Sequence, residues 1–206
     1  AAAIRENGLR ITGPVDEFTV EAYCTDPLRL DPGFKTVLLC VKAHHTSVAL
    51  NVIGQLLHED GFVVSVQNGL NERGIAGAVG PERTVGCFVN FGADVLEPGV
   101  IMRGNRGAVV VGELDGVRTD RISAVHALFQ DFDPDAVLTE NIWGYLWGKL
   151  AYGSMLFATA LADASIADVL ESAAHRPGII GLAREAMAVA AARGVKPEPF
   201  DGFDPG

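Results

Sequence analysis

Short apolar runs alternate with helical segments through the first two thirds of the chain, and this alternation limits the possible folds more than any other feature. A strand buried on both faces is expected at Thr36–Val41, followed by a buried strand at 61–66 and another strand at 83–95. Helices are expected between them, at 45–60 and 70–80. Because repeated strand–helix–strand units form right-handed crossovers, the sequence predicts an α/β fold with a mostly parallel sheet.

Four further segments complete this part of the chain. Residues 9–25 alternate as antiparallel or edge strands around a Gly-Pro turn, and residues 99–114 contain two strands joined by a Gly-Asn turn. A helix is expected at 120–132 and a short strand at 136–141.

The pattern changes near residue 140 and becomes helical to the end. The expected helices are Ile142–Ala162, Ile166–Ala174 and Pro177–Arg193. We therefore predict two domains, an α/β domain at 1–140 and an all-helical domain at 141–206.

Composition excludes several classes of function. The formal net charge is −10 and no basic patch is visible, so a nucleic-acid partner is not expected. Cys24, Cys40 and Cys87 are odd in number and form no C-x-x-C, which predicts buried free thiols in a reducing, cytoplasmic compartment and no metal site. The stretch Ile142–Ala162 is long enough to span a bilayer, but Lys149 near its centre favours a helix buried in protein over a membrane span.

Asn68-Gly69 lies where a buried strand meets a helix, within the stretch GFVVSVQNGLNERG. Asn-Gly usually signals a hairpin, but the residues that follow have helical character. In an open α/β sheet, ligands bind beyond the carboxyl ends of the strands, where Gly permits a tight bend and Asn offers an amide. We expect Asn68 to face this crevice; the alternative is that it only caps the helix.

Two lysines are further candidates for the site. Lys42 ends a strand and is either solvated or directed into the same crevice; His44 and His45 follow it, and their adjacency argues against a shared metal. Lys149 lies on an apolar helix face and must snorkel, pair with an acid or act in catalysis. Desolvation would lower the pKa of a buried lysine, and such an ammonium can donate a proton to a developing alkoxide.

The segments VKAHHT, QNGL and NIWGYLWGKL, in this order and spacing, resemble the ketopantoate reductase family of NADPH-dependent 2-keto acid reductases. The resemblance implies a Rossmann domain followed by a helical domain with the site between them, a small 2-keto acid substrate, a cytoplasmic homodimer and a role in pantothenate biosynthesis. It implies that Lys149 is the general acid and that Asn68 contacts both cofactor and substrate. Lys42 and His45 would line the NADP site.

Three departures from the family pattern stand out. The chain has no G-x-G-x-x-G, and GIAGAVG at 74–80 has the wrong spacing, so about 30 residues or more are expected upstream. The C-terminal helices that complete the substrate site in the family are expected beyond Gly206. Gly153 and Phe157 occupy positions where the family commonly has Asn. Either a neighbouring helix packs closely on Gly153, or the substrate wall has become small and apolar, which favours a bulkier, more apolar 2-keto acid.

Two other functions remain open from the sequence. One is another two-domain dehydrogenase, of the 3-hydroxyacid or glycerol phosphate type. The other is a catalytically inactive remnant that acts by oligomerisation. Substrate identity, NADP against NAD, and oligomeric state are not determined by these residues.

Overall fold

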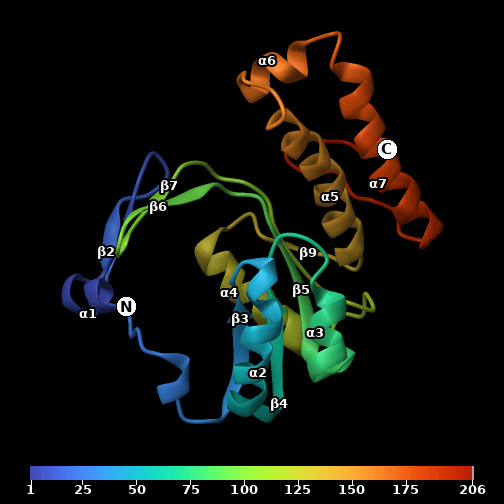
Figure 1. Cartoon of the computed structure of the whole chain (residues 1–206). Coiled ribbons are helices and arrows are strands. Elements are labelled where there is room, and N and C mark those ends of the chain that lie inside the picture. The colour runs from blue at the N-terminus through green and yellow to red at the C-terminus, as the bar shows by residue number, and fades with distance from the viewer. Residues whose placement is uncertain (206) are drawn as a thin grey trace.

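A five-stranded sheet forms the centre of the α/β part of the computed structural model, which describes residues 1–205 (Figure 1). Its strand order is β3-β4-β5-β8-β9. β3, β4 and β5 run parallel, β8 runs antiparallel to β5, and β9 is parallel to β8. The strands are β3 (Phe34–Leu39), β4 (Leu57–Ser65), β5 (Thr84–Val89), β8 (Val109–Glu113) and β9 (Val137–Leu138).

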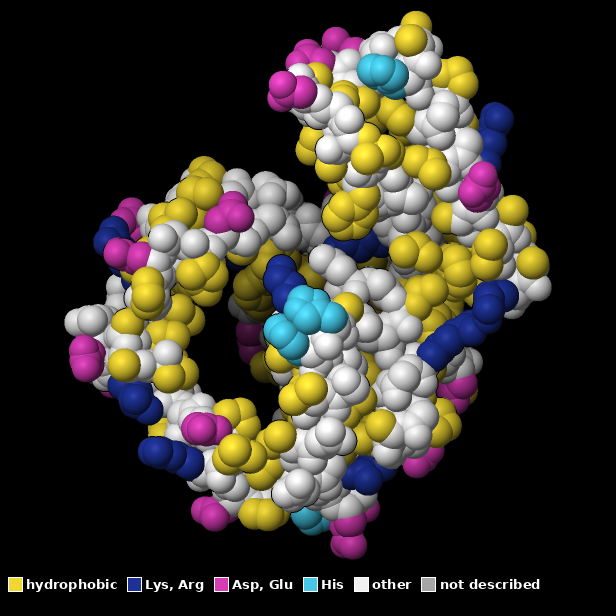
Figure 2. All heavy atoms as spheres, in the orientation of Figure 1, with side chains coloured by type: hydrophobic (Ala, Val, Ile, Leu, Met, Phe, Trp, Pro, Cys, Tyr) yellow, Lys and Arg dark blue, Asp and Glu magenta, His cyan; other side chains and the backbone are white. Residues whose placement is uncertain are grey.

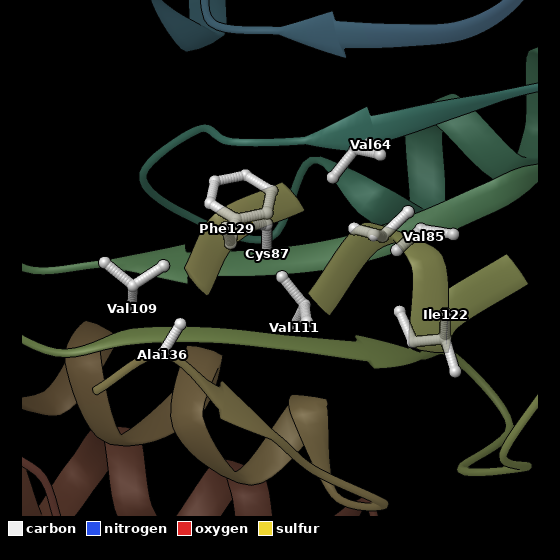
Figure 3. Close-up of a cluster of buried hydrophobic side chains, with 9 residues drawn as sticks. Val64, Val85, Cys87, Val109, Val111, Ile122, Phe129 and Ala136 are labelled. Atoms are coloured by element: carbon white, nitrogen blue, oxygen red, sulfur yellow. The ribbon is translucent and has the colours of Figure 1, made fainter. Parts of the chain in front are cut away.

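Helices cover both faces of this sheet, as the alternating pattern predicted. α4 (Asp120–Phe132) packs Ile122 and Phe129 onto Val64, Val85 and neighbouring apolar side chains, and Figure 3 shows this cluster between strands and helix. α2 (Thr46–Leu56) and α3 (Glu72–Val79) pack on another buried cluster, which contains Leu39, Ile53, Val63 and Ile75. The α/β class and the parallel β3-β4-β5 order are therefore confirmed.

A second sheet was not foreseen from the sequence. It has the order β2-β1-β7-β6 and follows a short helix, α1 (Ala2–Asn7). Its strands are β1 (Leu9–Thr12), β2 (Phe18–Val20), β6 (Ala93–Glu97) and β7 (Val100–Arg103). The antiparallel pairing expected within residues 9–25 is confirmed, since β1 and β2 pair antiparallel.

The segment 83–95, expected as one strand, is divided between the two sheets. β5 ends at Val89 and β6 begins at Ala93, and the returning strands β7 and β8 are likewise in different sheets. The two connections run side by side, hydrogen-bonded from Asn90 N to the Ala108 carbonyl at 2.9 Å, and so close that a Cβ at Gly107 would overlap the carbonyl of Asn90. A run of β-prone residues thus supplies two strands because the backbone turns between the sheets.

β3 corrects the expectation of a strand buried on both faces. It pairs only with β4 and forms an edge of the sheet; Phe34 and Leu38 are exposed, and only Leu39 is buried. The helix expected at 45–60 ends earlier, at Leu56, because Leu57 is extended and pairs with Phe34. β4 is therefore longer than the predicted strand at 61–66.

The last part of the chain is helical, as predicted. It contains α5 (Ile142–Thr159), α6 (Ile166–Glu171) and α7 (Arg176–Ala192), and the side chain of Asn141 caps α5 by accepting from Gly144 N at 3.1 Å. α5 packs on β5 and β8 through Phe88, Val110 and Leu146. Among residues 1–205, none of the helices combines the length and hydropathy needed to cross a membrane.

The three cysteines are free, but the expectation that all are buried is wrong. Cys87 is buried in β5, Cys24 is half-buried, and Cys40 is exposed because it follows the open edge strand β3. Within the described chain, no three His, Cys, Asp or Glu side chains are grouped so that they could hold a metal ion.

Candidate active site

A cavity of about 530 Å³ lies between the carboxyl ends of the sheet strands and α5. Four of the predicted site residues line it: Asn68, Lys149, Gly153 and Phe157. Asn90, which follows β5, lines it as well and was not singled out from the sequence. Figure 2 shows the surface hollowed where the helical part meets the α/β part.

Lys149 projects from α5 toward the end of β5. Its Nζ donates a hydrogen bond to the backbone oxygen of Val89 and lies 5.2 Å from the centre of the Phe88 ring. Burial lowers the pKa of Lys149 to about 8, while Cys87 and Asp201 act in the opposite direction. The side chain is thus neither snorkelling nor fully solvated; it is held at the cavity with a proton that it can release near neutral pH.

Asn68 is exposed at the start of the loop between β4 and α3. Gly69 has φ +100°, a conformation that favours glycine, which explains the Asn-Gly pair without a hairpin. The residue at the N-cap of α3 is Asn71, and its Nδ2 donates to the Asn68 carbonyl at 2.9 Å. The alternative that Asn68 only caps the helix is therefore wrong, and Asn68 lines the cavity.

Gln67 anchors this loop to neighbouring segments, and the sequence analysis did not predict this role. It is buried, and its Nε2 donates to the Val41 carbonyl and, at 2.9 Å, to Thr46 Oγ1. These bonds join the end of β4 to the end of β3 and to the start of α2. A glutamine directly after a buried strand is the signal that could have indicated this role.

Glu72 is a second buried polar residue under the same loop. Its carboxylate oxygens make no hydrogen bond within the described residues, although the Ser65 hydroxyl is near enough to favour the ionised form. Burial raises the pKa of Glu72 to about 7. A glutamate in the first turn of a helix is usually solvated. The burial of the Glu72 carboxylate therefore becomes apparent only from the packing of α3 on the sheet.

Lys42 and His45 lie apart from this cavity. Both are exposed at the end of β3 and the start of α2, and the His44 and His45 ring centres are 4.0 Å apart. His45 instead lines an apolar groove of about 570 Å³ between β3 and α2. Their proposed contact with NADP stays a prediction.

Gly153 has space around it. A Cβ built there would meet only the Phe157 ring, at 3.9 Å, so no neighbouring helix of the described chain requires a glycine at this position. Phe157 is 82% exposed, one turn further along α5. Within residues 1–205, close helix packing therefore does not account for Gly153, and the small, apolar substrate wall beside Lys149 stays a prediction.

The cavity combines two polar groups with a mostly apolar wall. Asn68 supplies an amide, Lys149 an ammonium, and the remaining lining is mostly apolar. The chain contains no G-x-G-x-x-G loop, the feature that holds the cofactor diphosphate in Rossmann folds.

Sheet and helices together define a Rossmann-like α/β fold with a helical second part. The chain matches the family model of the ketopantoate reductase PanE/ApbA over residues 1–116, and it belongs to this family. It is 31% identical over 157 residues to a 2-dehydropantoate 2-reductase of Pyrococcus horikoshii, which covers 75% of this chain and 50% of the relative. The chain thus spans about half the length of that relative.

Solved structures share the fold. The crystal structure of 2-dehydropantoate 2-reductase from Geobacter metallireducens GS-15 superimposes with a TM-score of 0.86 at 27% identity, over 97% of this chain and 67% of that chain. A ternary structure of D-mandelate dehydrogenase with NADH and anilino(oxo)acetate gives a TM-score of 0.81 at 19% identity, over 95% of this chain and 64% of that chain.

Proposed function

We propose that the protein reduces the carbonyl of a 2-keto acid with NADPH. The observation that carries this proposal is the placement of Lys149 and Asn68 at one cavity beyond the carboxyl ends of parallel strands. Family membership and the relatives named 2-dehydropantoate 2-reductase support the reaction class. Because the chain spans only part of those relatives, the activity is proposed for the whole protein.

The residues of the chain supply binding and a proton. The Lys149 ammonium faces the oxygen on which negative charge develops, stabilises that charge and gives it a proton. Asn68 orients the substrate and the nicotinamide. A reduced nicotinamide, when bound, would supply the hydride for the carbonyl carbon and leave as the oxidised cofactor. Since burial lowers the pKa of Lys149 to about 8, the side chain is mostly protonated at neutral pH and can still release its proton.

The family resemblance implies NADP in preference to NAD. Lys42 and His45 are the residues that we propose contact NADP. The fold alone does not determine this choice, since D-mandelate dehydrogenase, solved with NADH, shares it. We also keep as proposals the division into domains at 1–140 and 141–206, a homodimer and a cytoplasmic location.

The substrate is proposed to be bulkier or more apolar than ketopantoate. Gly153 and Phe157 provide no amide for a polar acyl chain, and the space beside Gly153 is open. Apolar walls discriminate only weakly between related ligands, so we expect a broad preference.

The test follows the absorbance of reduced nicotinamide during turnover, with ketopantoate and a panel of apolar 2-keto acids, NADPH and NADH being compared. A fluorescence titration with each cofactor accompanies it. Binding and turnover that require Lys149 support the proposal. Failure to bind either cofactor would support the catalytically inactive remnant instead.

A further inference from the structure

The segment after α7 returns to the candidate active site and is anchored there. Phe200 is 6% exposed and belongs to the buried cluster that joins β5 to α5. Phe200 and Phe203 exchange backbone hydrogen bonds of 3.0 and 2.8 Å. This tight turn holds Asp201 at φ +44°, in the left-handed region that non-glycine residues seldom occupy.

The Asp201 carboxylate joins two chain segments next to the cavity by hydrogen bonds. It accepts a hydrogen bond from Asn90 Nδ2 at 2.7 Å and from the backbone N of Ala108 at 3.0 and 3.1 Å. A carboxylate only accepts, so the amide nitrogen of Asn90 must face it. The amide oxygen of Asn90 is thereby left as the atom that can accept from a bound hydroxyl in the cavity that Asn90 lines.

Among residues 1–205, few charged or titratable groups shift the pKa of Lys149. β5 contributes the Val89 carbonyl, the Phe88 ring and the Cys87 thiol, and the C-terminal turn contributes Asp201. Burial raises the pKa of Cys87 far above its ordinary value, so the thiol is uncharged when Lys149 titrates. Among the groups that shift the pKa of Lys149 within residues 1–205, Asp201 is therefore the one that acts as an anion.

We propose that Asp201 is a positioning residue of the site, which fixes the amide of Asn90 and places a carboxylate next to the cavity that Asn90 and Lys149 line. The proposal deepens the reductase function and rests on it only for its effect on turnover. The electrostatic part concerns Lys149 itself and holds for the protein whatever its reaction.

The first experiment measures Lys149 without any turnover. Trace acetylation of the Lys149 amine, quantified by mass spectrometry across a pH series, gives the pH at which the amine becomes reactive. In Asp201→Asn the midpoint should move to lower pH by about half a unit, because a charge that favours protonation is lost and solvent screens an exposed carboxylate. The difference should shrink at high salt.

The matched control is Glu198→Gln, which removes a carboxylate from the same C-terminal segment. Glu198 accepts from Asn141 Nδ2 at 2.8 Å and is not among the groups that shift the pKa of Lys149. Its labelling midpoint should equal that of the wild type. An unchanged midpoint in Asp201→Asn, or an equal shift in Glu198→Gln, would overturn the proposal.

The second experiment uses the reductase assay. In Asp201→Asn the alkaline limb of kcat/KM should move to lower pH by the same amount as the labelling midpoint. A shifted midpoint in a protein without turnover would contradict the reductase function and leave the Asp201–Lys149 coupling intact. A shifted midpoint with an unmoved alkaline limb would contradict the role of Asp201 in turnover.

Discussion

Lys149 and Lys42 both come near the carboxyl ends of the sheet strands, yet their surroundings differ. Lys149 is packed between α5 and β5, bonded to Val89, and its pKa is lowered by burial. Lys42 is exposed beside the open edge strand β3, outside the cavity. A position at the end of a strand brings a lysine near the site. A lysine becomes a candidate for proton transfer only when a second element packs over it and shifts its pKa.

The comparison is tested most strongly by removing the buried lysine. Lys149→Ala should lower kcat by about a hundredfold or more, within the range of general acid catalysis. Lys149→Arg, which keeps a charge but holds its proton, should also be impaired. Near-normal turnover in the alanine variant would remove Lys149 from the mechanism.

Glu72, beneath the Asn68 loop, predicts a pH dependence of stability. Its pKa in the folded protein, about 7, lies above the ordinary 4.5, so the folded form holds the proton more tightly. Its contribution is complete below about pH 4.5 and is lost as the pH rises through about 7, by roughly 3 kcal/mol.

Urea unfolding of wild type and Glu72→Gln across this pH range measures the effect. The wild type should lose stability relative to the variant as the pH rises. Parallel stability curves would show that Glu72 is ionised in both states.

Asn68→Ala should weaken NADPH binding and turnover together, each by about tenfold, as expected for one lost hydrogen bond in a site. Fluorescence titration and steady-state kinetics measure the two quantities separately. Unchanged values for both would leave Asn68 as a residue of the loop without a role in the reaction.

Gly153→Asn should raise kcat/KM for ketopantoate relative to apolar 2-keto acids by several-fold, because an amide returns to the wall beside Lys149. Gly153→Ala is the control, since a Cβ fits there and alanine favours the helix by about 1 kcal/mol. A wild-type preference for ketopantoate of about a hundredfold would contradict the apolar-pocket proposal.

Lys42→Ala should have the smallest effect. The KM for NADPH should rise by a few-fold while kcat stays unchanged, and the difference in KM between variant and wild type should shrink at high salt. Loss of kcat comparable to that of Lys149→Ala would remove the contrast between the two lysines.

The sequence by itself determined the local elements and the residues that end them. The parallel strands β3 to β5, the three C-terminal helices, the turn at Asn68-Gly69 and the lysine on an apolar helix follow from periodicity and turn chemistry. Short-range sterics and hydrophobic patterning fix such features, so they can be read before the chain is folded.

Only the tertiary structure decided what lies next to what. The division of 83–95 between two sheets, the exposure of β3 and the burial of Glu72 depend on which elements pack together. Asn90 and Asp201 meet at 2.7 Å although 111 residues separate them, and no local pattern marks either one. Desolvation and distant charges set the state of Lys149, and both are properties of packing that the order of residues does not display.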